Sequence, residues 1–490
     1  MTDDRFTSST SRQAASEAAG AAPWLWLLAL ALLLRLLTLP LMPLTDHTEA
    51  RYAEIARLML QLGNWVSPHV TPEEVFWAKP PLSTWSQAAL MALFGVSEWS
   101  GRLAAWLWAL MTLAGLRWML GTAVSAVHRA AMQTALMLCP LFFLCAGAVM
   151  TDATLGATVL LVQAAWWRVL QDQGQARRRA GWVLGLAMGL ALLTKGPAAA
   201  VLALLPVLMH ATWRRHWPVA LQVIRDPLVW LAWMLVALPW YVLAELRTPG
   251  FIEYFVLGEH VMRFLQPGWK GDRYGFAHAE PLGMIWLYAL LAALPWLLAA
   301  ALRLGWLRWR RGAGAAAAQW RGTLGADLAC YALCIALAPL LLFSVARNII
   351  WTYALTALPG LVLLCLGLMS ERALAWRRGW GSAAALLALM AWAFVWKLPA
   401  VAERSSDKVL YEAYRSACPA QDCALSYMSK PPYSAYFYSA GRLYAGMPGT
   451  AGKPGFSVVS RPAPAATLAC NKDACLVQAN AAQAATPTLP

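Results

Sequence analysis

The chain has 490 residues, of which 60% are hydrophobic and only 13% are charged, so it is not an ordinary soluble protein, in which about a quarter of the residues carry charge. Its net charge of +15 is typical of proteins that bind nucleic acid, but the Lys and Arg residues stand in short loops between long apolar segments. We therefore expect membrane lipids as partners and no nucleic acid.

The first 22 residues are polar, rich in small side chains and unlike a signal peptide, so residues 1–22 are predicted to be a disordered cytoplasmic tail. A membrane domain follows over residues 23–400. Apolar stretches long enough to cross the bilayer predict about 11 transmembrane helices, and up to about 13. They cover residues 23–42, 102–120, 130–149, 152–169, 180–194, 197–213, 227–246, 282–303, 326–345, 349–369 and 379–398.

Charge predicts how these helices are oriented. Every connection on the side of the N-terminal tail contains arginines, and the positive-inside rule makes that side cytoplasmic. The opposite side has short turns near Asp152 and Lys195 and two long loops, 43–101 and 247–281. The apolar segment 80–96 is short, and a span there would invert every later loop, so we expect it to lie on the outer surface as a juxtamembrane helix.

An odd number of spans exports the C-terminal segment, so the N-terminus is predicted to be cytoplasmic and the C-terminus periplasmic. Residues 401–490 contain short β-like runs between Pro and Gly turns, which predict a small, mostly extended domain with a disordered end. Four of the nine cysteines lie there, and an oxidising compartment favours two disulfides among Cys418, Cys423, Cys470 and Cys475. Three pairings are open.

Polar residues unusual for a membrane protein gather on the predicted outer side. The first loop contains Asp46, Glu49, Arg51 and Tyr52 at the start of an amphipathic segment. A capped surface helix with early acidic residues is the alternative interpretation of this loop. The other polar residues on that side are Lys79, Asp152, Lys195, His260, Arg263, Arg347 and Tyr353.

This group combines three kinds of side chain that suit a phosphate and a sugar. Lys and Arg neutralise phosphate, aromatic rings pack against sugar faces, and a carboxylate serves as a general base. The residues come from segments spread over about three hundred positions, yet the predicted topology brings them to one face of the membrane. We therefore predict a binding site for a lipid-linked sugar at that face.

The order of motifs along residues 40–400 resembles a known family. The motifs are EARYAEIARLML, AKPPLSTW, SEWSGRLAAW, MTDATLG, LTKG, PWY followed by EHVMRF, and SVARNIIWTYALTALPG. They resemble bacterial polyprenyl-phosphate-sugar-dependent glycosyltransferases of the lipid A aminoarabinose transferase type, related to the protein mannosyltransferases (PMT). The resemblance implies an all-α polytopic fold of the GT-C type in the bacterial inner membrane. It also implies sugar transfer from a polyprenyl (undecaprenyl) phosphate donor to lipid A, another envelope glycan or a protein at the periplasmic face.

The resemblance also implies roles for particular residues. The family's first loop usually begins Asp-Glu-x-Arg-Tyr, but Thr48 stands in place of its leading candidate for the catalytic base. Glu49 or Asp46 would then supply the carboxylate, with Asp152 as a second acid. The predicted ligands of the donor phosphate and sugar are Arg51, Tyr52, Lys79, Lys195, His260, Arg263, Arg347 and Tyr353.

No cofactor is assigned, and a divalent metal remains an open alternative. Ala78 occupies a position where the aminoarabinose transferases have a glutamate that resembles a metal ligand, and His260 alone is a poor site for a divalent metal. Two other functions remain open. A lipid or sugar transporter (flippase) would place ionisable groups near the bilayer midplane, where only Arg35 lies well inside a predicted span. A catalytically degenerate GT-C binding protein would account for Thr48 and Ala78.

Overall fold

The computed structural model describes residues 4–266, 269–271, 273–274, 278–419, 423–445, 455–462 and 467–478. The chain divides into two compact units. The first unit contains Met1–Leu36, Phe76–Ser83 and Ala105–Met390, and the second contains Leu37–Val75, Thr84–Ala104 and Ala391–Pro490. Each unit is described by itself.

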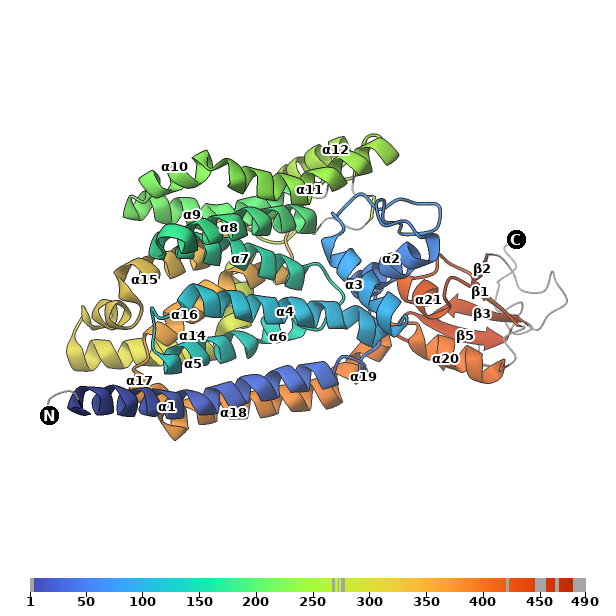
Figure 1. Cartoon of the computed structure of the whole chain (residues 1–490). Helices are drawn as coiled ribbons and strands as arrows, with labels where there is room; N and C mark the ends of the chain where they lie inside the picture. Colours follow the sequence, from blue (N-terminus) through green and yellow to red (C-terminus); the bar gives the residue numbers. More distant parts are fainter. Residues whose placement is uncertain are drawn as a thin grey trace. The chain divides into compact units, whose positions relative to one another are not determined.

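The first unit is built from helices (Figure 1). In chain order they are α1 (Asp4–Leu37), α4 (Glu98–Leu120), α5 (Ala126–Met137), α6 (Pro140–Cys145), α7 (Asp152–Gln171), α8 (Gly174–Lys195), α9 (Pro197–Arg214), α10 (Trp217–Arg225), α11 (Pro227–Arg247), α12 (Phe251–Glu253), η1 (Tyr254–Met262), α13 (Arg263–Leu265), α14 (Met284–Arg311), α15 (Ala315–Ser344), η2 (Trp351–Ala357), α16 (Leu358–Gly367), α17 (Glu371–Ala375) and α18 (Arg377–Trp392).

The membrane class predicted from hydropathy is confirmed, but with fewer long spans. Among the described residues, 8 helices are long and apolar enough to cross a membrane, and Trp351–Gly367 is a shorter apolar helix. The predicted span 130–149 is divided into α5 and α6, because Pro140 begins a new helix in the first-turn position that proline favours. Helix α15 has a non-helical residue at Gly325, so its apolar part begins at residue 326, as the sequence predicted.

The N-terminal segment differs from the expectation of a disordered tail over residues 1–22. Helix α1 begins at Asp4 and runs without interruption into the first apolar segment. Alanine is the strongest helix former, and the alanines that precede Pro23 allow the helix to extend beyond its apolar part.

Helix α7 lies at the centre of the first unit, and nearly all of its side chains are buried. It packs against α8, which in turn packs against α11 (Figure 1). Gly185 lets α8 and α11 approach closely, because a Cβ atom there would lie 2.4 Å from the carbonyl oxygen of Val229. The packing of α7 against α8 brings Asp152, the first residue of α7, next to Lys195, the last residue of α8.

The second unit combines the first loop with the C-terminal segment. Its helices are α2 (Thr48–Leu62), α3 (Leu82–Phe94), η3 (Ala393–Lys397), α19 (Leu398–Ala402), η4 (Glu403–Ser405), α20 (Lys408–Ala417) and α21 (Tyr433–Tyr438). Helix α2 packs against α21, so residues 37–75 group with the segment after residue 400. This grouping differs from the expectation of a separate domain over residues 401–490.

A five-stranded mixed sheet forms the C-terminal part of this unit, in the order β2-β1-β3-β5-β4. The strands are β1 (Ala424–Tyr427), β2 (Tyr444–Ala445), β3 (Gly455–Ser460), β4 (Thr467–Cys470) and β5 (Ala474–Gln478). Strand β1 pairs in parallel with β2 and β3, and β5 is antiparallel to β3 and β4. Leu410 and Tyr414 of α20 pack in one apolar cluster with Leu425, Phe456 and Leu476 of the sheet. The predicted extended domain is thus a small sheet covered by a helix.

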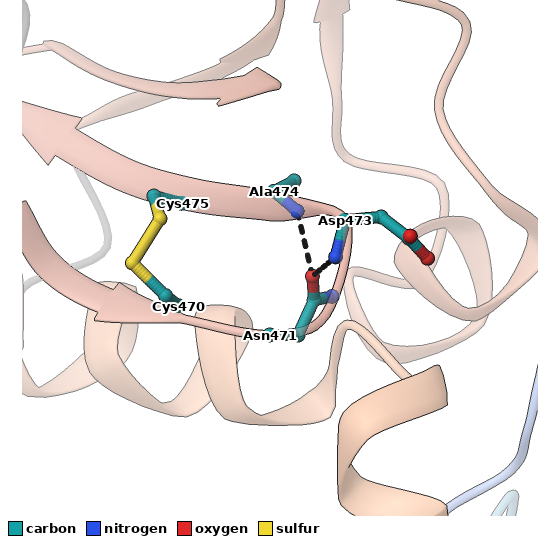
Figure 2. The surroundings of a disulfide bond; sticks show 5 residues. All are labelled: Cys470, Asn471, Asp473, Ala474 and Cys475. Atoms are coloured by element: carbon teal, nitrogen blue, oxygen red, sulfur yellow. Dashed lines mark hydrogen bonds between the residues drawn. A yellow bond between two sulfur atoms is a disulfide. The ribbon is translucent and has the colours of Figure 1, made fainter. Parts of the chain in front are cut away.

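The structure forms both predicted disulfides and selects one of the three pairings, Cys418–Cys423 and Cys470–Cys475. Figure 2 shows the second bond closing the turn from β4 to β5. The Asn471 side-chain oxygen accepts hydrogen bonds from the backbone N–H groups of Asp473 (3.0 Å) and Ala474 (2.8 Å), as asparagine often does in tight turns.

Candidate functional site

A pocket in the first unit gathers five of the eight donor ligands predicted from the sequence. It lies where α7, α8, α9, η1, α13 and η2 meet. The lining residues are Lys79, Leu155, Lys195, Ala198, Leu202, Glu259, His260, Arg263, Phe264, Phe343, Asn348 and Tyr353. The five predicted donor ligands share the wall with two further polar residues, Glu259 and Asn348, and with apolar side chains.

Glu259 is the central carboxylate of this pocket. Its Oε2 atom accepts hydrogen bonds from Lys79 Nζ at 3.0 Å and from Arg263 Nη1 at 2.9 Å. Its Oε1 atom accepts one from the Tyr254 hydroxyl at 3.1 Å. Burial pushes the pKa of Glu259 upward most strongly, but the charges and hydrogen bonds of Lys79 and Arg263 together bring it down to about 2. Glu259 is therefore ionised at neutral pH and holds two cations at the pocket wall.

Lys195 forms a second charged group with Asp152 and Tyr353. Its Nζ atom lies 3.6 Å from Asp152 Oδ1 and 4.5 Å from the centre of the Tyr353 ring. A cation at this distance is attracted by the face of an aromatic ring, which fixes the ammonium group without neutralising it. Counting both groups, Lys79, Lys195 and Arg263 bring three positive charges against the two negative charges of Glu259 and Asp152. The surplus positive charge suits an anionic ligand.

The turn between α8 and α9 places Lys195 at the pocket. Gly196 has a φ of 59°, and a Cβ atom there would lie 2.5 Å from the ring of Phe255. Only glycine takes up this conformation and leaves that space free. Pro197 then begins α9 at a position where its missing N–H costs no helical hydrogen bond. The LTKGP motif is thus a compact turn that presents one lysine.

His260 does not complete a metal site in this pocket. Its Nδ1 atom lies 2.7 Å from the carbonyl oxygen of Phe255, and its Nε2 atom lies 3.0 Å from that of Lys195. Burial lowers its pKa, while these two carbonyl contacts oppose the change. Both nitrogens therefore face backbone oxygens, and Ala78 offers no carboxylate. These residues do not fit a bound metal ion, and His260 instead ties η1 to the end of α8.

Aromatic residues surround the charged group. The Arg273 guanidinium lies 5.0 Å from the ring centres of both Trp77 and Tyr254, and the Tyr274 hydroxyl accepts a hydrogen bond from the backbone N–H of Trp77. Tyr254 also contacts Glu259 directly. Flat aromatic faces next to charged hydrogen-bonding groups suit a sugar ring.

The pocket residues and the arginine-rich segments lie at opposite ends of the same helices. Helix α7 begins with Asp152 and has Arg168 in its last turn, whereas α8 has arginines at its start and ends with Lys195. With 20 residues, α7 is about 30 Å long, the thickness of a bilayer core. The pocket is therefore at the membrane face opposite to the basic connections.

The first-loop residues have structural partners in the second unit, which also contains residues 98–104 at the start of α4. Both carboxylate oxygens of Glu49 accept hydrogen bonds at 2.8 Å from Arg102, which also donates to backbone carbonyls at Leu39, Met42 and Pro43. Arg102 thus fixes the chain as it enters α2. The alternative of a capped surface helix is only partly met, since α2 begins at Thr48 without a side-chain cap.

Asp46 accepts hydrogen bonds from the backbone N–H and the hydroxyl of Ser434, and burial raises the pKa of Asp46 to about 6. Tyr52 is buried, and the Arg51 guanidinium lies 5.4 Å from the centre of its ring. In the first unit, Arg347 is exposed and does not line the pocket, although its neighbour Asn348 does.

Two polar pocket residues are absent from the sequence-based set of ligands. Glu259 stands four residues before Arg263, the spacing at which opposite charges meet on a helix, and this signal could have identified it. Asn348 lines the pocket with a buried amide nitrogen that has no hydrogen-bond partner among the described residues. No sequence pattern marks it.

Comparison with known proteins agrees with this geometry. The profile of the dolichyl-phosphate-mannose-protein mannosyltransferase family matches residues 19–255. An undecaprenyl phosphate-alpha-4-amino-4-deoxy-L-arabinose arabinosyl transferase of Erwinia tasmaniensis is 28% identical over 337 residues, which cover 67% of this chain and 56% of the relative. The protein of the same name from Pseudomonas aeruginosa is 31% identical over 337 residues, covering 66% and 56%. The match thus spans little more than half the length of these relatives.

The fold is shared with a solved structure. The crystal structure of ArnT from Cupriavidus metallidurans bound to undecaprenyl phosphate superposes with a TM-score of 0.72 at 19% identity, covering 94% of this chain and 99% of that chain. The apo structure of the same protein gives 0.71. These comparisons confirm the resemblance to this group of glycosyltransferases and the GT-C fold that it implied.

Proposed function

We propose that this relative of the aminoarabinose and mannosyl transferases is a glycosyltransferase of the bacterial inner membrane. It moves a sugar from a polyprenyl phosphate donor, of the undecaprenyl phosphate class, to an acceptor at the periplasmic face. The observation that carries the proposal is the pocket in which Lys79, Lys195 and Arg263 adjoin apolar side chains of α7 and α9. A lipid phosphate needs cations for its phosphate group and apolar side chains for its hydrocarbon chain.

The cations act on the leaving group. The acceptor oxygen forms a bond to the anomeric carbon of the sugar, and the bond from that carbon to the phosphate oxygen breaks. The electron pair stays on the polyprenyl phosphate, whose negative charge increases. Lys79, Lys195 and Arg263 are already in place when this charge develops, so they stabilise the transition state more than the ground state.

The acceptor determines whether a base is needed. A phosphate acceptor already has an anionic oxygen, whereas a hydroxyl acceptor must lose a proton. We propose that Asp152 accepts this proton as the general base. Its Oδ1 atom has no hydrogen-bond partner among the described residues. Both oxygens of Glu49 are held by Arg102, which makes Glu49 a weaker candidate. The acceptor class covers lipid A, another envelope glycan and protein.

Orientation follows from charge. The arginines at the far ends of α7 and α8 support a cytoplasmic position for those ends, by the positive-inside rule, and therefore a pocket that faces the periplasm. With this orientation the N-terminus is cytoplasmic, and the disulfide-containing C-terminal segment lies in an oxidising compartment.

The test is sugar transfer by the purified full-length protein in lipid nanodiscs. The donor is a radiolabelled polyprenyl-phosphate sugar, and lipid A and an envelope-glycan extract are offered as acceptors. Lys195→Ala and Asp152→Asn are each expected to lower kcat by about 10²–10³, the usual cost of a lost preorganised contact. Arg347→Ala is the matched control, since Arg347 is exposed and does not line the pocket. It should stay within about threefold of the wild type.

The same assay separates the alternative functions. Wild-type rates in both Lys195→Ala and Asp152→Asn would overturn the assigned site. Donor binding without transfer would indicate a degenerate binding protein, and labelled lipid that crosses the bilayer unchanged would indicate a transporter. A mass-spectrometric comparison of envelope lipids and glycans from cells with and without the protein identifies the acceptor.

A further inference from the structure

A group of metal-ligating side chains lies away from the pocket, at the junction of three helices. His210 is in the last turns of α9, His216 precedes α10, and Asp327 lies two residues after the non-helical Gly325 of α15. Each offers one ligand atom, and these atoms lie within 4.8 Å of one another. It is the only group of three or more His, Cys, Asp or Glu side chains with this geometry in the described part of the chain.

The distances within this group suit a small tetrahedral ion. His210 Nε2 lies 3.5 Å from Asp327 Oδ1, and His216 Nε2 lies 3.3 Å from the same oxygen. Ligands at about 2.0–2.1 Å from a tetrahedral zinc ion are separated from one another by about 3.3 Å. The centres of the two imidazole rings are 5.1 Å apart. Two edges of a coordination tetrahedron are therefore already present.

His210 is the unusual member of the group. It is fully buried, and neither of its ring nitrogens makes a hydrogen bond to any described residue. The Tyr331 ring lies 4.7 Å away and the Trp167 ring 6.2 Å away, centre to centre. A buried imidazole without hydrogen bonds is costly, and most buried polar atoms in proteins have a partner. An ion bound through Nε2 would satisfy the nitrogen that points toward Asp327.

The group is separate from the sugar-transfer pocket. Helix α9 contributes Ala198 and Leu202 to the pocket near its start and His210 near its end. Leu202 and His210 are eight residues apart, or about 12 Å along the helix. An ion at His210 would therefore lie toward the basic ends of the helices and would not touch a sugar or phosphate in the pocket.

Arg214 competes with an ion for Asp327. Its Nε atom donates a hydrogen bond to Asp327 Oδ1 at 2.7 Å, but 42% of its side chain is exposed, so it is free to turn into solvent. Asp327 has two oxygens, and Oδ2 already faces His216. Competition of this kind predicts that removing Arg214 strengthens metal binding.

We propose that His210, His216 and Asp327 bind one divalent transition-metal ion of the zinc class, with water in the fourth position. Two imidazoles and one carboxylate form a ligand set that zinc accepts, and imidazole favours it over magnesium or calcium. The ion links the α9–α10 turn to α15 and so holds together three helices at the membrane face opposite the pocket. Its role is structural.

The full-length protein is purified in detergent, treated with EDTA and dialysed to remove bound metal. Competition with a chromophoric chelator then measures its affinity for added zinc, and elemental analysis measures how much zinc is bound. The wild type is expected to bind one zinc ion per chain and to gain thermal stability when zinc is added. His216→Ala and Asp327→Asn should each weaken binding at least about a hundredfold. Arg214→Ala should tighten it by about tenfold.

Two controls make the result decisive. His69→Ala removes another half-buried histidine, far from the group in sequence, and should leave zinc binding unchanged. His216 is itself half-buried, so its variant is expected to fold even where a change at His210 would not. The proposal is overturned if the wild type binds no zinc, or if His216→Ala and Asp327→Asn still bind one equivalent. A loss of stability in Arg214→Ala, with no effect of zinc, would identify an ion-pair contact instead.

Discussion

Lys79 and Arg263 share one carboxylate: Glu259 Oε2 lies 3.0 Å from Lys79 Nζ and 2.9 Å from Arg263 Nη1. The two cations belong to segments about 180 residues apart and would repel each other without this anion between them. Glu259 is therefore a positioning residue for the groups that are proposed to hold the donor phosphate.

Replacing Glu259 with Gln is expected to lower kcat by about tenfold or more, because the two cations lose the charge that fixes their separation. Binding of undecaprenyl phosphate should not weaken, since the pocket gains one net positive charge. Transfer kinetics at several donor concentrations separate the two effects. An unchanged kcat, or a rise in KM alone, would contradict the positioning role.

Glu259 should also make the free energy of unfolding fall at acidic pH. Its pKa is lowered from 4.5 to about 2 in the folded protein, so the ionised form stabilises the fold above pH 4.5. That contribution, about 3 kcal/mol for a change of this size, is lost as pH falls from 4.5 toward 2. The melting temperature of the detergent-solubilised wild type should therefore fall as the pH is lowered through this window. Glu259→Gln should show a flatter pH profile, and an identical profile would exclude Glu259 as the source.

Arg102 and Glu49 give a test that separates structure from catalysis in the first loop. Arg102→Ala removes the two hydrogen bonds that Arg102 donates to the buried carboxylate of Glu49, and breaking a buried ion pair typically costs about 3–5 kcal/mol. Arg102→Lys should recover only part of the loss, because lysine cannot donate two parallel hydrogen bonds. We expect Glu49→Gln to lower the melting temperature together with activity. If it abolished transfer while the melting temperature stayed unchanged, Glu49 would be the catalytic base.

Gly196→Ala tests the turn that presents Lys195. The added Cβ atom would lie 2.5 Å from the Phe255 ring, in a backbone conformation that alanine rarely adopts. Strain of this kind costs about 1–3 kcal/mol, and the displaced Lys195 should reduce transfer markedly. Gly305→Ala, where a Cβ atom meets nothing within 4 Å, is the control and should behave as the wild type. Equal activity in both variants would show that the turn tolerates movement.

Local properties of the sequence were sufficient to predict the membrane class, the helical segments and the cations of the site. Hydropathy and helix propensity act over neighbouring residues, so segments such as 152–169 and the apolar start at residue 326 could be placed without a structure. Charge bias predicted Lys79, Lys195 and Arg263 on one face of the membrane, and all three line one pocket, while their role as donor ligands stays a prediction. The presence of two disulfides followed from compartment and cysteine number.

Tertiary structure decided which of these residues meet. Arg102 binds Glu49 across 53 positions, and Lys79 binds Glu259 across 180, and no periodicity in the sequence connects them. The choice of Cys418–Cys423 and Cys470–Cys475 among the three possible pairings likewise became known only from the folded chain. The sequence determined what kind of environment each segment requires, because burial and charge are properties of individual side chains. Which partners fill that environment was decided only by packing, since contacts between distant side chains depend on how the helices fit together.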